Sequence, residues 1–511
     1  MTNSLDRTVA PPPAPPSETA NRWPPQIKFI IGNEACERFS YYGIRGILAL
    51  YISQTLFSSL ASGKAMDRAT EIIHYFVFAN YFLALPGAWL SDKLLGRYNT
   101  ILYVSLVYCL GNLVLALTVG SPVGLLVGLG LIALGSGGIK PCVSAFCGDQ
   151  FKAEQSKLLQ KAYGLFYWSI NFGSFFGFLV IPWLREHKGY RIAFGVPGIF
   201  MLIATIIFWS GRKYYMRVPP TTQTKSAGFM RVTWYALSHL GHRKSGQSMW
   251  DVARERFTAR EVDAARSVGP ILAVFAPICI FWSLFDQTSS TWVMQGNKMA
   301  NCEVLVNLAK QALSAIHITD VTASKIASAF IISAEQMQST NALLVMILVP
   351  LMLWLYPRIE KLTGMRVSPL RRMGAGLVLG AVSYVIVGLL QTRVDAGAQL
   401  SVLWQTIPYI LLTTGEVLLS TTGLEFAFTQ AAAEMKSTIM SFWLLTVASG
   451  NLFVPVLTSF KGHLLGTASE SASVSASTFY LYAGLTLGVA IVFALIAMRY
   501  KERELELTSS M

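Results

Sequence analysis

The chain has 511 residues, of which 53% are hydrophobic and 13% are charged, and its mean hydropathy is +0.48. Soluble domains carry about 25% charged residues, so this composition excludes an ordinary soluble protein and indicates an all-α membrane protein. The formal net charge of +14 would fit a nucleic-acid partner, but the distribution of the basic residues gives it another explanation.

Apolar runs of about 20 residues, the length that crosses a hydrocarbon core about 30 Å thick, recur along the chain. We predict twelve spans, at 27–53, 70–91, 99–119, 123–147, 161–183, 193–211, 268–294, 337–357, 372–391, 401–429, 436–460 and 477–499. With both termini cytoplasmic, 28 Lys and Arg residues lie on the cytoplasmic side, 10 on the external side and 3 within spans, which accounts for all 41. This excess follows the positive-inside rule, so no nucleic-acid partner is expected.

The pattern divides the chain into five segments. Residues 1–26 are polar and Pro-rich, which predicts a disordered cytoplasmic arm without a cleavable signal peptide. Two groups of six spans, at 27–211 and 268–500, flank a basic cytoplasmic linker at 212–267, and 501–511 form a cytoplasmic tail. Six plus six spans are typical of transporters whose halves rock around a central site, although a channel or a receptor also fits the count.

Within the linker, the segment SMWDVARERFTAREVDAARS (248–267) mixes apolar and charged residues. It suits an amphipathic helix that lies on the membrane surface or against the bundles. A solvated connection with some helix is an equally weighted alternative.

The first span carries four ionisable groups in an otherwise apolar run: Glu34, Glu37, Arg38 and Arg45. At about 100° per residue they share one arc of the helix, roughly 140° wide, with Tyr41 and Tyr42. A charge at the membrane centre costs about 2.5 to 3.5 kcal/mol on insertion scales, so this face must meet a partner or water inside the protein. Neutralisation of Glu34 by Arg38 alone would explain two of the four charges.

Other spans also carry ionisable groups: His74 begins the second, Lys140 is in the fourth, Asp286 in the seventh, and Glu416 and Glu425 in the tenth. Lys140 and Glu416 belong to opposite halves. A bridge between them would hold one conformation closed until a proton or a substrate competes for either end. Structural neutralisation stays open for any single residue among them.

No enzyme chemistry is visible in the sequence. LGSGGIKP (134–141) lacks the GK[ST] ending of a phosphate-binding loop and lies in an apolar span. HExxH, GxSxG and paired CxxC motifs are absent, and five of the six cysteines fall in spans as small apolar residues. Neither an enzyme, a metal site nor a disulfide framework is predicted.

Five motifs in order carry a family resemblance: EACERFSYYG (34–43), GSGGIKPCVSAFCGDQF (135–151), FYWSINFGSFFG (166–177), FWSLFDQTSSTW (281–292) and GEVLLSTTGLEFAF (415–428). Over about residues 27–500 the chain resembles the proton-dependent oligopeptide transporter family, a branch of the major facilitator superfamily. The resemblance implies two six-helix bundles that import di- and tripeptides by alternating access. The proton is the coupling ion, and no other cofactor is implied.

The resemblance also implies roles for single residues. Glu34 and Glu37 match the proton-linked glutamates, and Arg38 matches their counter-charge and a ligand for the peptide carboxylate, which Lys140 would support. The positions that match residues holding the peptide amino terminus are Asn171, Asn341 and Glu416. The positions that match the adaptable pocket walls are Tyr41, Tyr42, Tyr81, Trp282, Ser420 and Trp443.

Arg45 and Asp286 match a pair at the outer gate, and His74 aligns with a histidine of mammalian and some bacterial members. We therefore expect a proton-sensitive external gate in which His74 could accept the incoming proton before Glu34 and Glu37 do. The alternative is that His74 is only a polar residue at the membrane interface. Three positions depart from the common pattern: Asp286 stands where many members have Glu, KPC replaces KPN, and QSTNA replaces QSLNP.

The leading hypothesis is a monomeric peptide symporter in the inner membrane of a bacterium, with the lipid bilayer and its peptides as partners. Some bacterial relatives insert two spans between the halves, but 212–267 has no apolar run long enough for one. One alternative is a relative retuned to another anion such as nitrate, and another is a peptide receptor that does not transport.

Overall fold

The computed structural model describes residues 23–220, 228–242, 247–301, 331–430, 432, 435–465 and 474–500. Within these ranges the chain is helical, and its one β-type contact is an isolated bridge between Ala300 and Ser401. The predicted N-terminal arm and C-terminal tail lie outside the described residues, except for 23–26.

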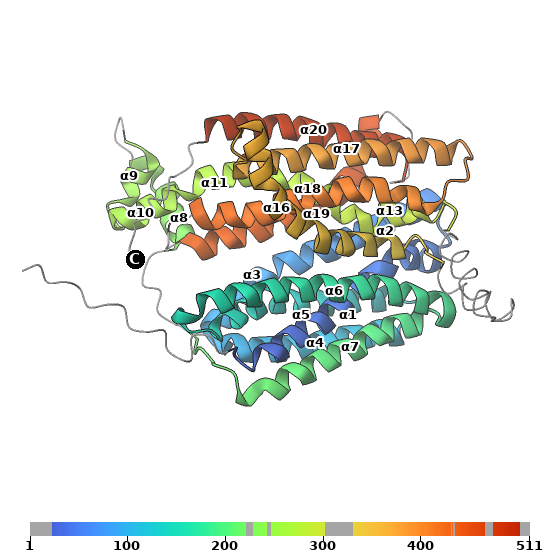
Figure 1. Cartoon of the computed structure of the whole chain (residues 1–511), viewed down its shortest axis with the longest axis horizontal. Helices are drawn as coiled ribbons and strands as arrows, with labels where there is room; N and C mark the ends of the chain where they lie inside the picture. Colours follow the sequence, from blue (N-terminus) through green and yellow to red (C-terminus); the bar gives the residue numbers. More distant parts are fainter. Residues whose placement is uncertain are drawn as a thin grey trace, which may run out of the picture.

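The first half of the chain forms the lower part of the molecule in Figure 1. Its helices are α1 (Ile27–Leu50), α2 (Ser62–Phe82), α3 (Ala84–Leu90), α4 (Gly96–Leu117), α5 (Pro122–Asp149), α6 (Ser156–Lys188) and α7 (Tyr190–Ser210). α1 packs against α6 and α7, and α4 packs against α5 and α7. The charged face of α1 therefore lies inside a bundle rather than in lipid, as its burial confirms.

The second half forms the upper part of Figure 1. Its helices are α11 (Val268–Phe275), α12 (Ile278–Phe285), α13 (Thr291–Gly296), α16 (Ser339–Thr363), α17 (Pro369–Asp395), α18 (Thr406–Gln430), α19 (Lys436–Leu465) and α20 (Ala476–Arg499). α17 packs against α18 and α20, and α12 packs against α19. Two contacts join the halves most extensively: α2 with α19, and α6 with α16.

Nine helical stretches among the described residues are long and apolar enough to cross a membrane, or ten if the bent pair Ala259–Phe275 and Ile278–Gly296 is one span. One stretch, Ser62–Leu117, has 56 residues, enough for two of the predicted spans because about 20 suffice for one crossing. α1 is long enough but carries the four charges. The protein is a multi-pass membrane protein, and the number twelve stays a prediction.

Two predicted spans are interrupted where proline removes a backbone donor. α2 ends at Phe82 and α3 begins at Ala84, because Pro86 has no N–H to bond the carbonyl of Phe82. The span predicted at 268–294 is divided into α11, α12, a 3₁₀ turn at Asp286–Ser289 and α13, with a bend of 46° near Pro277. The turn places Asp286 and the serines that follow it away from a regular helix surface.

The linker contains three short helices where we predicted one. These are α8 (Phe229–Ser238), α9 (Met249–Ala253) and α10 (Ala259–Arg266), which lie beyond the helix ends at the left of Figure 1. Thr258 ends the turn after α9 and caps α10, since its hydroxyl accepts from the Glu261 N–H at 3.3 Å. The expected amphipathic segment is thus divided at Thr258, while its apolar members Val252 and Val262 are buried.

Close approach of α1 and α6 depends on glycine. A Cβ on Gly177 would lie 2.8 Å from the Phe39 carbonyl oxygen, and one on Gly43 would lie 2.6 Å from Ile181. Since real Cβ contacts are longer, these two helices touch backbone to backbone. This contact holds the charged face of α1 at a fixed place in the first half.

Candidate functional site

The charged cluster of α1 is an ion triad inside the protein. Arg38 Nε lies 3.2 Å from Glu34 Oε1 and directly against the Glu37 carboxylate. Glu37 is fully buried, and Ser136 of α5 donates to its other oxygen at 3.4 Å. Two carboxylates thus compete for one guanidinium, so withdrawal of Arg38 would leave a buried carboxylate without its cation.

Lys140 of α5 is half-buried, and its buried Nζ has no carboxylate within ion-pair distance among the described residues. Its Nζ lies 3.8 Å from the centroid of the Tyr81 ring and 4.9 Å from that of Tyr41. Nζ has no hydrogen-bond partner among the described residues. The two aromatic faces stabilise the ammonium by about 2 kcal/mol each when it is desolvated, but neither supplies a negative charge, which leaves the ammonium available to an anionic ligand.

Two of the three residues expected to hold the peptide amino terminus, Asn341 and Glu416, lie in the second half, and Asn171 lies on α6 of the first half. Asn341 Nδ2 donates to Glu416 Oε2 at 2.8 Å and to Thr413 Oγ1 at 3.1 Å. Both residues line a cavity of about 140 Å³ between the halves, together with Tyr42, Arg45 and Asn171. This volume is below the roughly 300 Å³ of small-molecule sites, so the cavity is too small in this conformation to hold a ligand of that size.

The predicted bridge between Lys140 and Glu416 is not formed. Among the described residues Lys140 has the tyrosine contacts and Glu416 has Asn341, and no ion pair joins the two. Glu425, also predicted as an intramembrane charge, is half-exposed and pairs with Arg372 at 2.9 Å. It is a surface pair at the end of α18.

The expected pocket walls gather only in part. Trp282 of α12 and Trp443 of α19 meet edge to face with ring centroids 6.2 Å apart. Ser420 is half-buried one turn beyond Glu416. These three side chains do not line the 140 Å³ cavity, and neither do Arg38, Tyr41, Tyr81 and Lys140.

The predicted gate residues are joined in one buried network. Arg45 Nη2 of α1 lies 2.5 Å from Asp286 Oδ1, and Asn451 Nδ2 of α19 donates to Asp286 Oδ2 at 2.6 Å. His74 Nδ1 of α2 lies 2.8 Å from Asn451 Oδ1, and its Nε2 lies 3.0 Å from Ser290 Oγ. Because Asn451 donates to Asp286, its oxygen accepts from His74, which assigns the imidazole proton to Nδ1. The network links two helices of each half.

Asn451 was absent from the sequence-based assignment, although an Asn in the apolar run SGNLF is a signal that could have found it. It is fully buried. It is the group that connects the histidine to the Asp286 carboxylate, so His74 and Asp286 communicate through an amide rather than directly.

A second inter-half ion pair was also not predicted. Arg185, at the end of α6, donates to Glu335 Oε2 from Nη2 at 2.5 Å and from Nε at 3.0 Å. Nearby, Gln338 donates to the Gly46 carbonyl at 3.1 Å, and Gln336 donates to the Leu179 carbonyl at 3.0 Å. Glu335 is fully buried just before α16, and burial raises its pKa to about 7 despite the guanidinium.

The described residues contain no cluster of three His, Cys, Asp or Glu side chains that could hold a metal ion.

Comparison with known proteins places these features in a family. The model of the POT family matches residues 98–318 and 304–464. Solute carrier family 15 member 2 of Rattus norvegicus is 33% identical over 416 residues, which is 77% of this chain and 53% of that protein. Peptide transporter family 1 of Drosophila melanogaster is 36% identical over 394 residues, 74% of this chain and 49% of that protein. The chain thus spans about half the length of the curated relatives it matches.

Solved structures agree over almost the whole chain. The POT family transporter PepTSo has a TM-score of 0.83 and 39% identity, covering 94% of this chain and 99% of that one. An auto-inhibited POT family peptide transporter has a TM-score of 0.82 and 37% identity, covering 94% and 98%. Because the family model matches most of the chain and these relatives and structures are similar over most of its length, this chain belongs to the POT family.

Proposed function

We propose that the protein is a proton-coupled symporter that imports di- and tripeptides by alternating access. The single observation that carries the proposal is the buried network of Arg45, Asp286, Asn451 and His74, which spans both halves. A titratable group placed in a contact between moving parts couples protonation to the opening of that contact. The names of the relatives, which are peptide transporters, support the substrate class.

The coupling step follows from the α1 triad. A peptide carboxylate that binds Arg38 takes this guanidinium from Glu37, which lies fully buried beside it. A buried carboxylate without its cation is costly, so it takes up a proton. Peptide and proton then load together, and they leave together when the site opens to the other side.

Selectivity for short peptides follows from two poles of opposite charge. Arg38 and Lys140 would bind the carboxylate, and Glu416 with Asn171 and Asn341 would bind the amino group. A free amino acid is too short to reach both poles, and a longer chain does not fit between them. The side chains meet adaptable aromatic walls, so length is selected more strictly than sequence.

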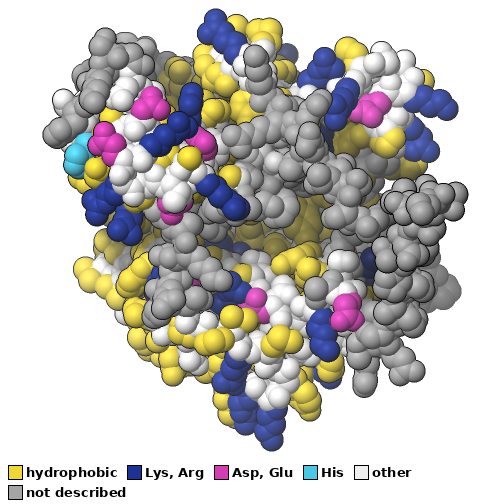
Figure 2. All heavy atoms as spheres, turned by 90° about the vertical axis from the view of Figure 1, so that its left-hand side faces the viewer, with side chains coloured by type: hydrophobic (Ala, Val, Ile, Leu, Met, Phe, Trp, Pro, Cys, Tyr) yellow, Lys and Arg dark blue, Asp and Glu magenta, His cyan; other side chains and the backbone are white. Residues whose placement is uncertain are grey.

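We assign the end of the molecule that carries α8–α10 to the cytoplasm. Figure 2 shows this end, where Lys and Arg side chains occur over both halves. The positive-inside rule supports this orientation, with twelve spans and both termini inside. Arg45 lies eleven residues beyond Glu34, about 16 Å further toward the external end at 1.5 Å per residue. The inner membrane of a bacterium is the location that the motif resemblance implies, and a monomer is the expected state.

Two other functions compete with this one. A transporter of another anion such as nitrate needs no amino-terminal pole, so the contact of Asn341 with Glu416 at 2.8 Å favours a zwitterion. A peptide receptor would bind without moving its ligand. Transport assays separate all three.

The deciding experiment measures uptake of a labelled dipeptide into proteoliposomes with and without an inward proton gradient. We expect accumulation above equilibrium only with the gradient, competition by di- and tripeptides, and none by free amino acids or tetrapeptides. Binding without uptake would favour the receptor, and competition by nitrate would favour the anion transporter. Accumulation above equilibrium that does not depend on the proton gradient would contradict proton coupling.

A further inference from the structure

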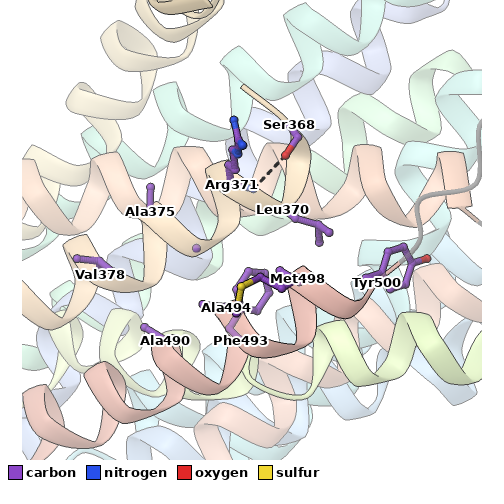
Figure 3. Close-up of a pocket in the computed structure, with 12 residues that line it drawn as sticks. Ser368, Leu370, Arg371, Ala375, Val378, Ala490, Phe493, Ala494, Met498 and Tyr500 are labelled. Atoms are coloured by element: carbon purple, nitrogen blue, oxygen red, sulfur yellow. Dashed lines mark hydrogen bonds between the residues drawn. The ribbon is translucent and has the colours of Figure 1, made fainter. Parts of the chain in front are cut away.

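A groove of about 510 Å³ lies on the second half, outside the transport site. It runs between the first turns of α17 and the last turns of α20, at the end of the molecule assigned to the cytoplasm. Figure 3 shows Ala375 and Val378 on the α17 wall and Ala490, Phe493 and Ala494 on the α20 wall. Most of these side chains are small, so they leave the space between the two helices unfilled.

The groove opens onto the surface that faces lipid. Beside and beyond it, α17 exposes Val382, Val385 and Leu389, and α20 exposes Leu487, Ile491 and Leu495, each at 41% or more. Apolar side chains exposed along two membrane helices are in contact with acyl chains. The groove between α17 and α20 is therefore an apolar extension of the lipid-facing surface, and an acyl chain could occupy it.

The rim of the groove is cationic. Arg371 lies there on α17 and is exposed, and its Nη1 donates to the Arg366 carbonyl at 2.9 Å. No ion pair with Arg371 is present in the described part of the chain, whereas the adjacent Arg372 pairs with Glu425 at 2.9 Å. The Arg371 charge is thus left for an external anion. Ser368, also at the rim, caps α17 by accepting from the Arg371 N–H at 3.4 Å.

A second groove of about 410 Å³ lies on the other flank of α20. It includes Arg499, and the two grooves share Tyr500. The end of α20 is therefore bordered by one arginine on each side. Both lie at the cytoplasmic end, where phospholipid headgroups meet the protein.

The first half supplies an internal contrast. A groove of about 420 Å³ between α4 and α7 is lined by residues such as Leu113, Ala116 and Leu202, with no charged side chain. Such a groove accepts an acyl chain without regard to its headgroup. The arginine at the rim is what distinguishes the groove between α17 and α20.

We propose that this groove binds an anionic phospholipid of the cytoplasmic leaflet, with an acyl chain between α17 and α20 and the phosphate on Arg371. The positive charge of Arg371 favours an anionic headgroup. The opening of the groove toward lipid favours a phospholipid over a soluble phosphate compound, because the soluble compound has no acyl chain to fill the groove. Zwitterionic lipids enter the same groove but gain less from the guanidinium.

Native mass spectrometry of the full chain in detergent tests this proposal. The protein is titrated with phosphatidylglycerol and with phosphatidylcholine of identical chains, and soluble glycerol phosphate is added as a competitor. We expect about tenfold tighter binding of phosphatidylglycerol and no competition by glycerol phosphate. Equal affinity for the two lipids would overturn the headgroup assignment, and effective competition would make this a soluble phosphate site.

Three variants make the test specific. Arg371→Gln should lower phosphatidylglycerol affinity to the phosphatidylcholine level and leave phosphatidylcholine unchanged. Gly374→Phe should weaken binding of both lipids, because a Cβ added there would lie 3.6 Å from the Phe493 ring and the rest of the larger side chain would fill the groove. Arg212→Gln removes a half-buried arginine at the start of the linker, outside both grooves, and it should change neither affinity. Thermal melting of each variant verifies folding, and a folded Arg371→Gln protein that keeps its preference would refute the site.

Discussion

In the function proposed above, Glu37 is the residue where proton binding and peptide binding meet. It is fully buried, its carboxylate contacts Arg38, and Ser136 donates to it. Glu34 still pairs with Arg38 when Glu37 is neutral, at 3.2 Å, so the helix keeps an ion pair. Removing the Glu37 charge should therefore affect coupling more than folding.

Glu37→Gln should abolish accumulation driven by a proton gradient, with a loss of tenfold or more, because the amide cannot take up the proton. Exchange of internal for external peptide should continue. Glu425→Gln, which neutralises a surface carboxylate paired with Arg372, is the control and should accumulate peptide normally. Normal accumulation by Glu37→Gln would show that the proton is carried elsewhere.

Asn451 tests whether His74 acts through the network or alone. Asn451→Leu keeps the volume but removes the donor to Asp286 and the acceptor for His74. A hydrogen bond to a charged group contributes about 1.5 to 3 kcal/mol, equivalent to one to two pH units. The midpoint of uptake against external pH should therefore move by about one unit or more.

The control for this change is Asn112→Leu, in which a buried Asn of α4 loses a bond to the Tyr108 carbonyl of its own helix. Its pH profile should equal that of the unaltered protein. If the two variants gave the same profile, the amide would be a packing residue and the gate would reduce to the pair of Arg45 with Asp286.

At the scale of elements, α6 and α16 are connected by Arg185 and Glu335. Burial raises the pKa of Glu335 from about 4.5 to about 7, while Arg185 opposes this shift and Glu186 adds to it. When the contact opens to water, the pKa falls back toward 4.5. The closed form thus binds the proton more tightly, and acid favours closure as the pH falls from about 7 toward 4.5.

Double electron–electron resonance between spin labels at the exposed Lys188 and Lys298 measures this closure. The closed fraction should rise between pH 7 and pH 5 in the unaltered protein. Glu335→Gln should remove most of this dependence, whereas Glu186→Gln should keep it. An unchanged pH response in Glu335→Gln would assign the effect to His74 and Asp286 instead.

Helical periodicity and proline are the signals that the sequence supplied at this scale. The 100° repeat placed Glu34, Glu37 and Arg38 on one face, and the structure brings their side chains into contact. Pro277 and Pro86 divide spans that hydropathy alone treats as continuous, because hydropathy does not register a missing backbone donor. The helices of the linker are more difficult to predict from the sequence, because such short helices depend on capping and on burial of single residues.

Contacts between the halves were beyond reach of the sequence. Arg185 and Glu335 are 150 residues apart, and His74 and Asn451 are 377 apart. No local pattern relates such pairs, because they depend on how two packed bundles are oriented. The family resemblance predicted that Arg45, Asp286 and His74 form one group, but it did not predict that the Asn451 amide joins His74 to Asp286.

For the whole molecule, the described conformation holds the two halves together at the assigned external gate. The Asp286 network and the pair of Arg185 with Glu335 both span the interface, while Lys140 and Glu416 remain unjoined to each other. Alternating access requires that these contacts break in another conformation, and that binding and release of the proton and the peptide control this change. The central claim is therefore that one transport cycle moves both together.

The most direct measurement records the internal pH of proteoliposomes loaded with a pH-sensitive dye, with no imposed proton gradient and with the membrane potential clamped. External dialanine should acidify the lumen as it enters, while alanine at the same concentration should not. The Glu37→Gln protein should exchange labelled dialanine without acidification. Entry of dialanine into vesicles of the unaltered protein at constant internal pH would contradict the account.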